Sequence, residues 1–180
     1  PYTTLFRSVN SDKVDAAVAA LTRAQPQAIL QVSLFNTTAA FIRKMRKAGY
    51  AGAFMNFSVV GIDPLFTALG KEIGGVVVSQ VVPSPWNASV PLSREFQRLA
   101  RAQGIEEFTF SQMEGFLSAK FLVEALERAG PKPTRASLVQ ALEGMRVNLG
   151  GYPVELSPTQ HSSGKFVDLL MLGKDGKFAR

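Results

Sequence analysis

Two short polar segments of this chain have the residue types needed to hydrogen-bond a small molecule, and each directly follows a predicted strand. They are residues 33–37 and residues 56–58. Their hydroxyl and amide groups can donate and accept hydrogen bonds, and Phe35 and Phe57 can cover the apolar part of a ligand. The chemistry that they favour is non-covalent binding of a small polar organic compound. Ordinary turn formation and helix capping are the open alternative.

The elements that must position these segments alternate as in an α/β fold. Patterns of apolar residues and turn residues predict helices at about 12–24, 39–48 and 64–70, and strands at 28–32, 53–57 and 76–82. This alternation predicts parallel strands joined by right-handed crossovers. Because the carboxyl ends of parallel strands meet at one edge of a sheet, both polar segments should lie at that edge. Asn36 or Thr37 is expected to cap the second helix, and Asp63 the third, with Pro64 at its first position.

Beyond residue 83 the alternation stops. Helices are predicted at about 92–103 and 111–129, a further helix after a Thr134 cap, an extended segment at 107–110, and a strand near 166–172. Ser111 and Glu114 have the S-x-x-E spacing of a capping box. That spacing assigns Glu114 to a helix cap rather than to a buried functional carboxylate.

Catalytic and metal-binding patterns are poor in this sequence. The chain has no cysteine, which excludes disulfides, thiolate metal sites and cysteine nucleophiles. Its single histidine, His161, lies in a Ser/Thr/Gly-rich loop with no carboxylate near it in sequence, so we expect an ordinary surface histidine. The glycines form neither a dinucleotide-binding nor a phosphate-binding loop. We therefore expect no cofactor, no metal and no catalysis.

The charge and the apolar runs indicate neither nucleic acid nor membrane insertion. The net charge is +6, but the basic residues are scattered except at 43–47, where they lie in the last turns of a predicted helix. No apolar run approaches the roughly 18 residues of a membrane-spanning helix. Residues 1–8 resemble the conceptual translation of a sequencing adapter, and we expect them to be foreign to the protein, with a genuine short strand as the alternative.

An ordered set of segments resembles the periplasmic substrate-binding proteins of branched-chain-amino-acid-type ABC transporters, which have the type I periplasmic binding protein fold. The segments are residues 39–50, 54–58, 75–80, 114–120 and 124–130. The resemblance implies two α/β lobes, each with a parallel sheet between helical layers, and a ligand bound between the lobes. Family members are about twice as long as this chain, so the resemblance implies a C-terminal fragment. It assigns residues 9–106 to part of the second lobe and residues 107–180 to a hinge crossing and part of the first.

The resemblance also implies where the ligand is bound. It places contacts of the second lobe near Leu34 and Ser58, where amino-acid-binding members tend to have an aromatic hydroxyl and a carboxylate. The absence of an anionic partner for an ammonium group argues against a plain amino acid, because a buried unpaired charge is costly. An amide, a carboxylate, a urea-like or an aromatic compound is as plausible. The candidate ligand-binding residues are Ser33, Leu34, Phe35, Asn36, Thr37, Asn56, Ser58, Gln80 and Gln112.

We therefore predict a fragment of a periplasmic solute-binding protein that delivers a small ligand to an inner-membrane ABC permease. The signal peptide would lie in the part of the protein that precedes this chain. Two alternatives stay open: a ligand-sensing domain of a receptor or regulator with the same fold, and a fragment of an α/β enzyme.

Overall fold

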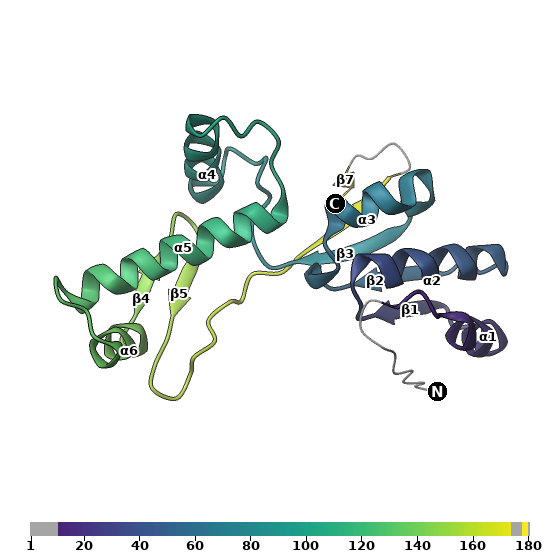
Figure 1. Cartoon of the computed structure of the whole chain (residues 1–180), viewed down its shortest axis with the longest axis horizontal. Coiled ribbons are helices and arrows are strands. Elements are labelled where there is room, and N and C mark those ends of the chain that lie inside the picture. Colours follow the sequence, from purple (N-terminus) through teal and green to yellow (C-terminus); the bar gives the residue numbers. More distant parts are fainter. Residues whose placement is uncertain (1–10, 174–177, 180) are drawn as a thin grey trace. The chain divides into compact units, whose positions relative to one another are not determined.

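The computed structural model describes residues 11–173 and 178–179, and the chain forms two compact units (Figure 1). Unit 1 comprises the described residues up to Gln80 together with those from Leu169 onward, and unit 2 comprises Val81–Asp168. The segment expected to be foreign, residues 1–8, lies outside the described residues.

Unit 1 is built around a five-stranded sheet with the strand order β1-β2-β3-β6-β7. β1, β2 and β3 pair in parallel, and β6 pairs with β7 antiparallel. The strands are β1 (Ala28–Gln31), β2 (Ala53–Asn56), β3 (Val76–Gln80), β6 (Asp168–Leu172) and β7 (Phe178–Ala179). The helices are α1 (Asp15–Ala24), α2 (Phe35–Lys47) and α3 (Ile62–Leu69), with the 3-10 turns η1 (Ser58–Val60) and η2 (Gly70–Ile73). The predicted α/β fold with a mainly parallel sheet is confirmed.

One face of this sheet forms the core of unit 1. Ile29, Phe54 and Val76 lie side by side in register and are buried. α2 packs on this face, where the ring of Phe41 meets that of Phe54 edge to face. Side chains alternate between the two faces of a strand, so Met55 points to the other face and is 42% exposed.

Two helices of unit 1, α2 and α3, begin earlier than the sequence patterns predict, whereas α1 begins later, at Asp15 rather than about residue 12. α2 starts at Phe35, and Leu34 is its N-cap residue without any side-chain cap, so the predicted caps Asn36 and Thr37 lie inside the first turn. α3 starts at Ile62, and Gly61 precedes it. Gly61 has a φ of 70°, which lets the chain turn directly from η1 into α3, so Asp63 also lies inside its helix rather than at the cap.

Unit 2 is mainly helical. It contains α4 (Pro91–Ala102), α5 (Phe110–Ala129) and α6 (Arg135–Glu143), together with an antiparallel pair, β4 (Arg146–Asn148) and β5 (Pro153–Glu155). α5 and α6 pack together, as do α4 and α5. Phe110, which was expected to end an extended segment, is the first residue of α5.

Aromatic packing places α4 in unit 2. The ring of Phe96 lies 5.4 Å from that of Phe108 and 5.6 Å from that of Phe116, measured between ring centroids. Lys120 Nζ of α5 lies 2.9 Å from Glu95 Oε2 of α4. The chain leaves the first compact unit after Gln80, and the lobe boundary that the resemblance implies, between residues 106 and 107, stays a prediction.

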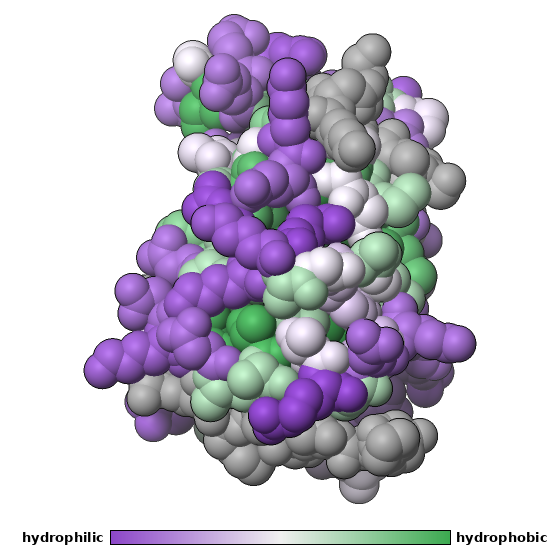
Figure 2. Space-filling view, turned by 90° about the vertical axis from the view of Figure 1, so that its right-hand side faces the viewer, coloured by the Kyte–Doolittle hydropathy of each residue, from purple (hydrophilic) through white to green (hydrophobic). Residues whose placement is uncertain are grey.

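The capping box of α5 differs from the predicted one. Thr109 is the N-cap, and its hydroxyl accepts from the backbone N–H of Gln112, while the backbone N–H of Thr109 donates to Gln112 Oε1. The assignment of Ser111 and Glu114 to this box is wrong, because the helix starts one residue earlier than the pattern indicates. Thr134 does cap α6, through a box completed by Ser137. None of the described helices combines the length and the apolar composition that crossing a bilayer requires. Figure 2 shows hydrophilic and hydrophobic residues interspersed over one face of the molecule.

Candidate ligand-binding site

The two polar segments singled out in the sequence follow neighbouring parallel strands. Gln31, the last residue of β1, pairs with Asn56, the last residue of β2, and Asn56 pairs with Val78 of β3. Residues 33–37 and 56–58 thus leave the same edge of the sheet. We refer to the carboxyl ends of β1, β2 and β3, with the residues that follow β1 and β2, as the carboxyl edge.

Ser33 is part of a hydrogen-bonded chain at this edge. Its Oγ lies 2.6 Å from Thr38 Oγ1 and accepts from Gln31 Nε2 at 3.1 Å. Thr38 is fully buried. Gln31 and Thr38 were not among the predicted site residues, because a partner five positions along the chain becomes apparent only once the helix start is known.

Several buried polar atoms at the carboxyl edge have no hydrogen-bond partner among the described residues. They are Gln31 Oε1, Thr37 Oγ1, Asn56 Oδ1, Gln80 Oε1 and Gln80 Nε2. Thr37, Asn56 and Gln80 are 5%, 4% and 1% exposed. Leaving a buried polar group unsatisfied costs about 1–3 kcal/mol. A concentration of such groups at one edge is therefore unfavourable for the fold by itself.

The remaining candidates at this edge are more accessible. Leu34 and Phe35 are half-buried at the start of α2, and Asn36 is exposed. Ser58 is half-buried at the start of η1, next to Phe57, which is 44% exposed. These side chains add two aromatic rings and a hydroxyl around the buried polar atoms.

Gln112 does not belong to this edge. It lies in unit 2, where its side chain closes the capping box of α5. The amide oxygen of Gln112 thus has a structural partner, and its assignment to a ligand stays a prediction.

Charged side chains are sparse at the carboxyl edge, where Asp63 lies in the first turn of α3. Residues 31–38, 56–62 and 78–80 contain no Asp, Glu, Lys, Arg or His. The partial positive charge of the α2 N-terminus lies at this edge, and no side chain caps it. The site is therefore mainly polar, with acceptor oxygens beside the N–H groups of a helix start.

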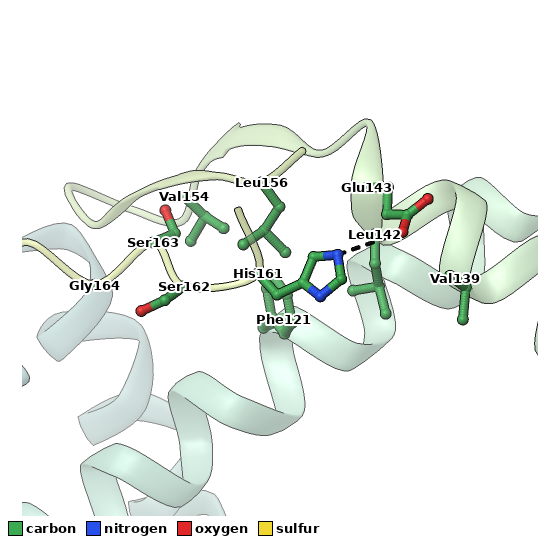
Figure 3. Close-up of a pocket in the computed structure, with 10 residues that line it drawn as sticks. All are labelled: Phe121, Val139, Leu142, Glu143, Val154, Leu156, His161, Ser162, Ser163 and Gly164. Atoms are coloured by element: carbon green, nitrogen blue, oxygen red, sulfur yellow. Dashed lines mark ion pairs between the residues drawn. The ribbon is translucent and has the colours of Figure 1, made fainter. Parts of the chain in front are cut away.

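A cavity of about 560 Å³ lies elsewhere, in unit 2. Figure 3 shows that its walls come from α5, α6, β5 and the loop that follows β5. The lining is mainly apolar and consists of Phe121, Val139, Leu142, Val154 and Leu156, with Glu143, His161, Ser162, Ser163 and Gly164 completing it. No predicted site residue contributes to this cavity.

His161 has a carboxylate partner that the sequence did not reveal. Its Nε2 lies 3.4 Å from Glu143 Oε1, drawn as the dashed line in Figure 3. In the part of the chain that the structure describes, no serine hydroxyl is hydrogen-bonded to His161, and no group of His, Cys, Asp or Glu could hold a metal ion. The histidine side of the pair is exposed, which is typical of a surface contact rather than of a catalytic dyad.

Two titratable groups of unit 2 have shifted pKa values. Burial raises the pKa of the Glu114 carboxyl above its ordinary value. Burial also raises the pKa of Tyr152, and the negative charge of Glu114 raises it further. The Tyr152 hydroxyl donates to the carbonyl oxygen of Val81. Glu114 and Tyr152 are therefore electrostatically coupled.

Comparison with known proteins gives a consistent result. A family model described as "Periplasmic binding protein" matches residues 5–176. A substrate-binding periplasmic protein from Ralstonia solanacearum is 30% identical, with a TM-score of 0.82 over 93% of this chain and 49% of that one. A possible leucine/isoleucine/valine-binding protein from Rhodopirellula baltica SH 1 is 28% identical, with a TM-score of 0.89 over 97% of this chain and 48% of that one.

A third solved structure, an extracellular ligand-binding receptor from Verminephrobacter eiseniae, is 28% identical, with a TM-score of 0.77 over 92% of this chain and 49% of that one. The present chain thus spans about half the length of these relatives. No curated protein matches it.

Proposed function

Because this chain belongs to the periplasmic binding protein family, we propose that it is part of the solute-binding component of an ABC importer. In this role it has no catalytic activity, works in the periplasm, binds a small polar organic solute and presents it to a membrane permease. The observation that supports the binding role most directly is the concentration of unpartnered polar atoms at the carboxyl edge of unit 1. Ligands of open α/β sheets bind outside the carboxyl ends of the strands.

We assign the ligand contacts to the residues of that edge. Ser33, Leu34, Phe35, Asn36, Thr37, Asn56, Ser58 and Gln80 form the proposed set. Ser33 holds the loop in place, Phe35 covers an apolar part of the ligand, and Thr37, Asn56 and Gln80 offer hydrogen bonds. The remaining ligand contacts would come from parts of the protein other than unit 1.

The solute we propose is not a branched-chain amino acid. The name of the Rhodopirellula baltica relative mentions leucine, isoleucine and valine. At the positions where the resemblance implies contacts, this chain has Leu34 and Ser58, neither of which can neutralise an ammonium group. Burying an ammonium without an anionic partner is unfavourable.

Calorimetry on the complete gene product that carries this chain tests the proposal. We expect one or more neutral polar solutes from a metabolite panel to bind with a Kd in the micromolar range or below, and leucine to bind weakly or not at all. Tight leucine binding would contradict the ligand assignment. If no solute binds and the protein instead turns over a substrate, the solute-binding role itself is wrong.

A second experiment separates transport from sensing. Disruption of the gene should abolish uptake of the identified solute by cells if the protein serves an importer. Unchanged uptake, together with loss of a transcriptional or behavioural response to that solute, would favour the sensing alternative.

A further inference from the structure

The chain passes from unit 1 to unit 2 after Gln80 and returns to unit 1 at Leu169. We call residues 80–82 the outgoing segment and residues 166–169 the return segment. We propose that Tyr152 clamps both segments on the side of unit 2, so that they change conformation together. This role concerns motion of the backbone and goes beyond the proposed function, because it does not depend on which solute is bound.

Tyr152 contacts the outgoing segment with its hydroxyl and the return segment with its ring. The hydroxyl donates to the carbonyl oxygen of Val81 at 3.2 Å. The ring centroid lies 6.2 Å from that of Phe166, within the range of about 4.5–7 Å for interacting aromatic pairs. Tyr152 is buried, and leaving a buried hydroxyl without a partner is unfavourable. One side chain therefore stabilises the conformation of both segments.

The backbone that carries Tyr152 is itself fixed within unit 2. The carbonyl oxygen of Tyr152 accepts from the backbone N–H of Leu149 at 2.9 Å, and Leu149 is buried. The neighbouring carbonyl oxygen of Gly150 accepts from the backbone N–H of Leu92, in the first turn of α4, also at 2.9 Å. Tyr152 thus holds the two segments against a turn that is anchored to α4.

The hydroxyl of Tyr152 also keeps the proton that it donates to Val81. Burial raises the pKa of Tyr152, and the negative charge of Glu114 in α5 raises it further. The phenol therefore stays neutral at physiological pH, and its hydrogen bond is not lost through ionisation.

On the side of unit 1, both segments are continuous with the sheet. β3 ends at Gln80 and β6 begins at Asp168, and these two strands are neighbours in the strand order. Hinges consist of a few residues at the ends of elements that absorb changes of φ and ψ. Val167, which is 66% exposed, is such a residue between Tyr152's contacts and β6. Because so few residues separate the clamp from the strands, a change in one segment is transmitted to the other through Tyr152.

Hydrogen exchange, measured by mass spectrometry on the complete gene product that carries this chain, tests the clamp. Tyr152→Phe removes only the hydroxyl that holds the outgoing segment, and Phe166→Leu removes the ring that holds the return segment. We expect each variant to accelerate amide exchange in both segments about threefold or more. The proposal is overturned if each variant affects only the segment whose contact it removes, or if neither variant accelerates exchange.

A matched variant and an internal reference separate the clamp from a general loss of stability. The hydroxyl of Tyr50 donates to the carbonyl oxygen of Ala53 at 3.3 Å within unit 1, so Tyr50→Phe removes the same kind of bond elsewhere. It should leave exchange in both segments as in the wild type. In Tyr152→Phe and Phe166→Leu, the amides of residues 113–125 in α5 should exchange at the wild-type rate. Equal acceleration of these amides, or acceleration of the two segments in Tyr50→Phe, would contradict the clamp.

Discussion

The hydroxyl of Ser33 lies 2.6 Å from that of Thr38, which ties the loop after β1 to the first turn of α2. Thr38 is fully buried, and Gln31 adds a second hydrogen bond to the Ser33 oxygen. A loop held from both sides can present the neighbouring side chains at the carboxyl edge in one arrangement. Pre-organisation of this kind reduces the entropy lost when a ligand binds.

Ser33→Ala should destabilise unit 1. The substitution removes the partner of a buried Thr38 hydroxyl, and an unsatisfied buried group costs about 1–3 kcal/mol. Urea denaturation should show a lower free energy of unfolding by about that amount. Ser118→Ala, at an exposed position of α5, is the matched control and should change the free energy by less than about 0.5 kcal/mol. An equal effect of both variants would mean that the Ser33 bond contributes nothing specific.

Phe54→Ala should be among the most destabilising changes in unit 1. The ring is fully buried, meets Phe41 and Tyr50 edge to face, and lies under the Arg46 guanidinium. Truncating a buried phenylalanine leaves a cavity and costs about 3–5 kcal/mol. The neighbouring Met55→Ala, on the exposed face of the sheet, should cost below about 1 kcal/mol. Comparable losses in the two variants would show that both faces of the sheet are covered.

Gly150→Ala should destabilise unit 2 more than Gly151→Ala does. Both glycines have positive φ, 71° and 97°, where an L side chain is strained. Only at Gly150 would a new Cβ also lie 2.9 Å from Leu92 N, the group that donates to the Gly150 carbonyl. At Gly151 the nearest atom would be 3.8 Å away. We expect the free energies of unfolding of the two variants, measured by chemical denaturation, to differ by about 1–3 kcal/mol. Equal losses of stability would refute the close approach of Leu92.

Glu114 should make the protein's stability depend on pH. Because burial raises its pKa, the folded chain holds this proton to higher pH than the unfolded chain does. The protonated carboxyl of Glu114 therefore makes its full contribution to the free energy of unfolding below pH 4.5, the ordinary pKa of glutamate. This contribution is lost as the pH rises through the raised pKa. Glu114→Gln should accordingly be more stable than the wild type at neutral pH and equal to it at about pH 3.5. A gain that is the same at both pH values would contradict this explanation.

The same substitution should change the titration of Tyr152. The charge of Glu114 contributes to the raised pKa of this tyrosine, after burial, so Glu114→Gln should move the pKa down toward its ordinary value. Ultraviolet absorbance of the phenolate measures this directly. Glu106→Gln, at an exposed position, is the control and should leave the Tyr152 titration as it is in the wild type.

The ion pair between Lys120 and Glu95 should stabilise the fold more than an exposed ion pair does. The side chains are 28% and 35% exposed, and Nζ lies within hydrogen-bond distance of both carboxylate oxygens. A double-mutant cycle with Lys120→Met and Glu95→Gln should give a coupling of about 1 kcal/mol. The pair Arg146 and Glu155, which is 81% and 64% exposed, should give below about 0.5 kcal/mol in the matched cycle. Equal couplings would show that burial does not distinguish the two pairs.

Local sequence patterns were sufficient to predict which segments of unit 1 form helices and strands, and in which order. Alternation of apolar runs and turn residues correctly predicted β1, β2 and β3 with the helices between them, because these periodicities are properties of neighbouring residues. Helix starts were less predictable. Thr109 rather than Ser111 caps α5, since several residues near a helix start can act as a cap and only the backbone conformation selects one.

The sequence by itself determined that polar residues follow two successive strands of an α/β alternation. Only the tertiary structure decided which of these side chains are satisfied. Ser33 is paired with Thr38, whereas Thr37, Asn56 and Gln80 hold buried polar atoms without partners in the described part of the chain. Similarly, the carboxylate of Glu143 approaches His161 only after α6 and the loop that follows β5 have folded together. The physical reason is that periodicity arises along the chain, while burial and hydrogen-bond partners depend on strand register and on the packing of segments that are distant in sequence.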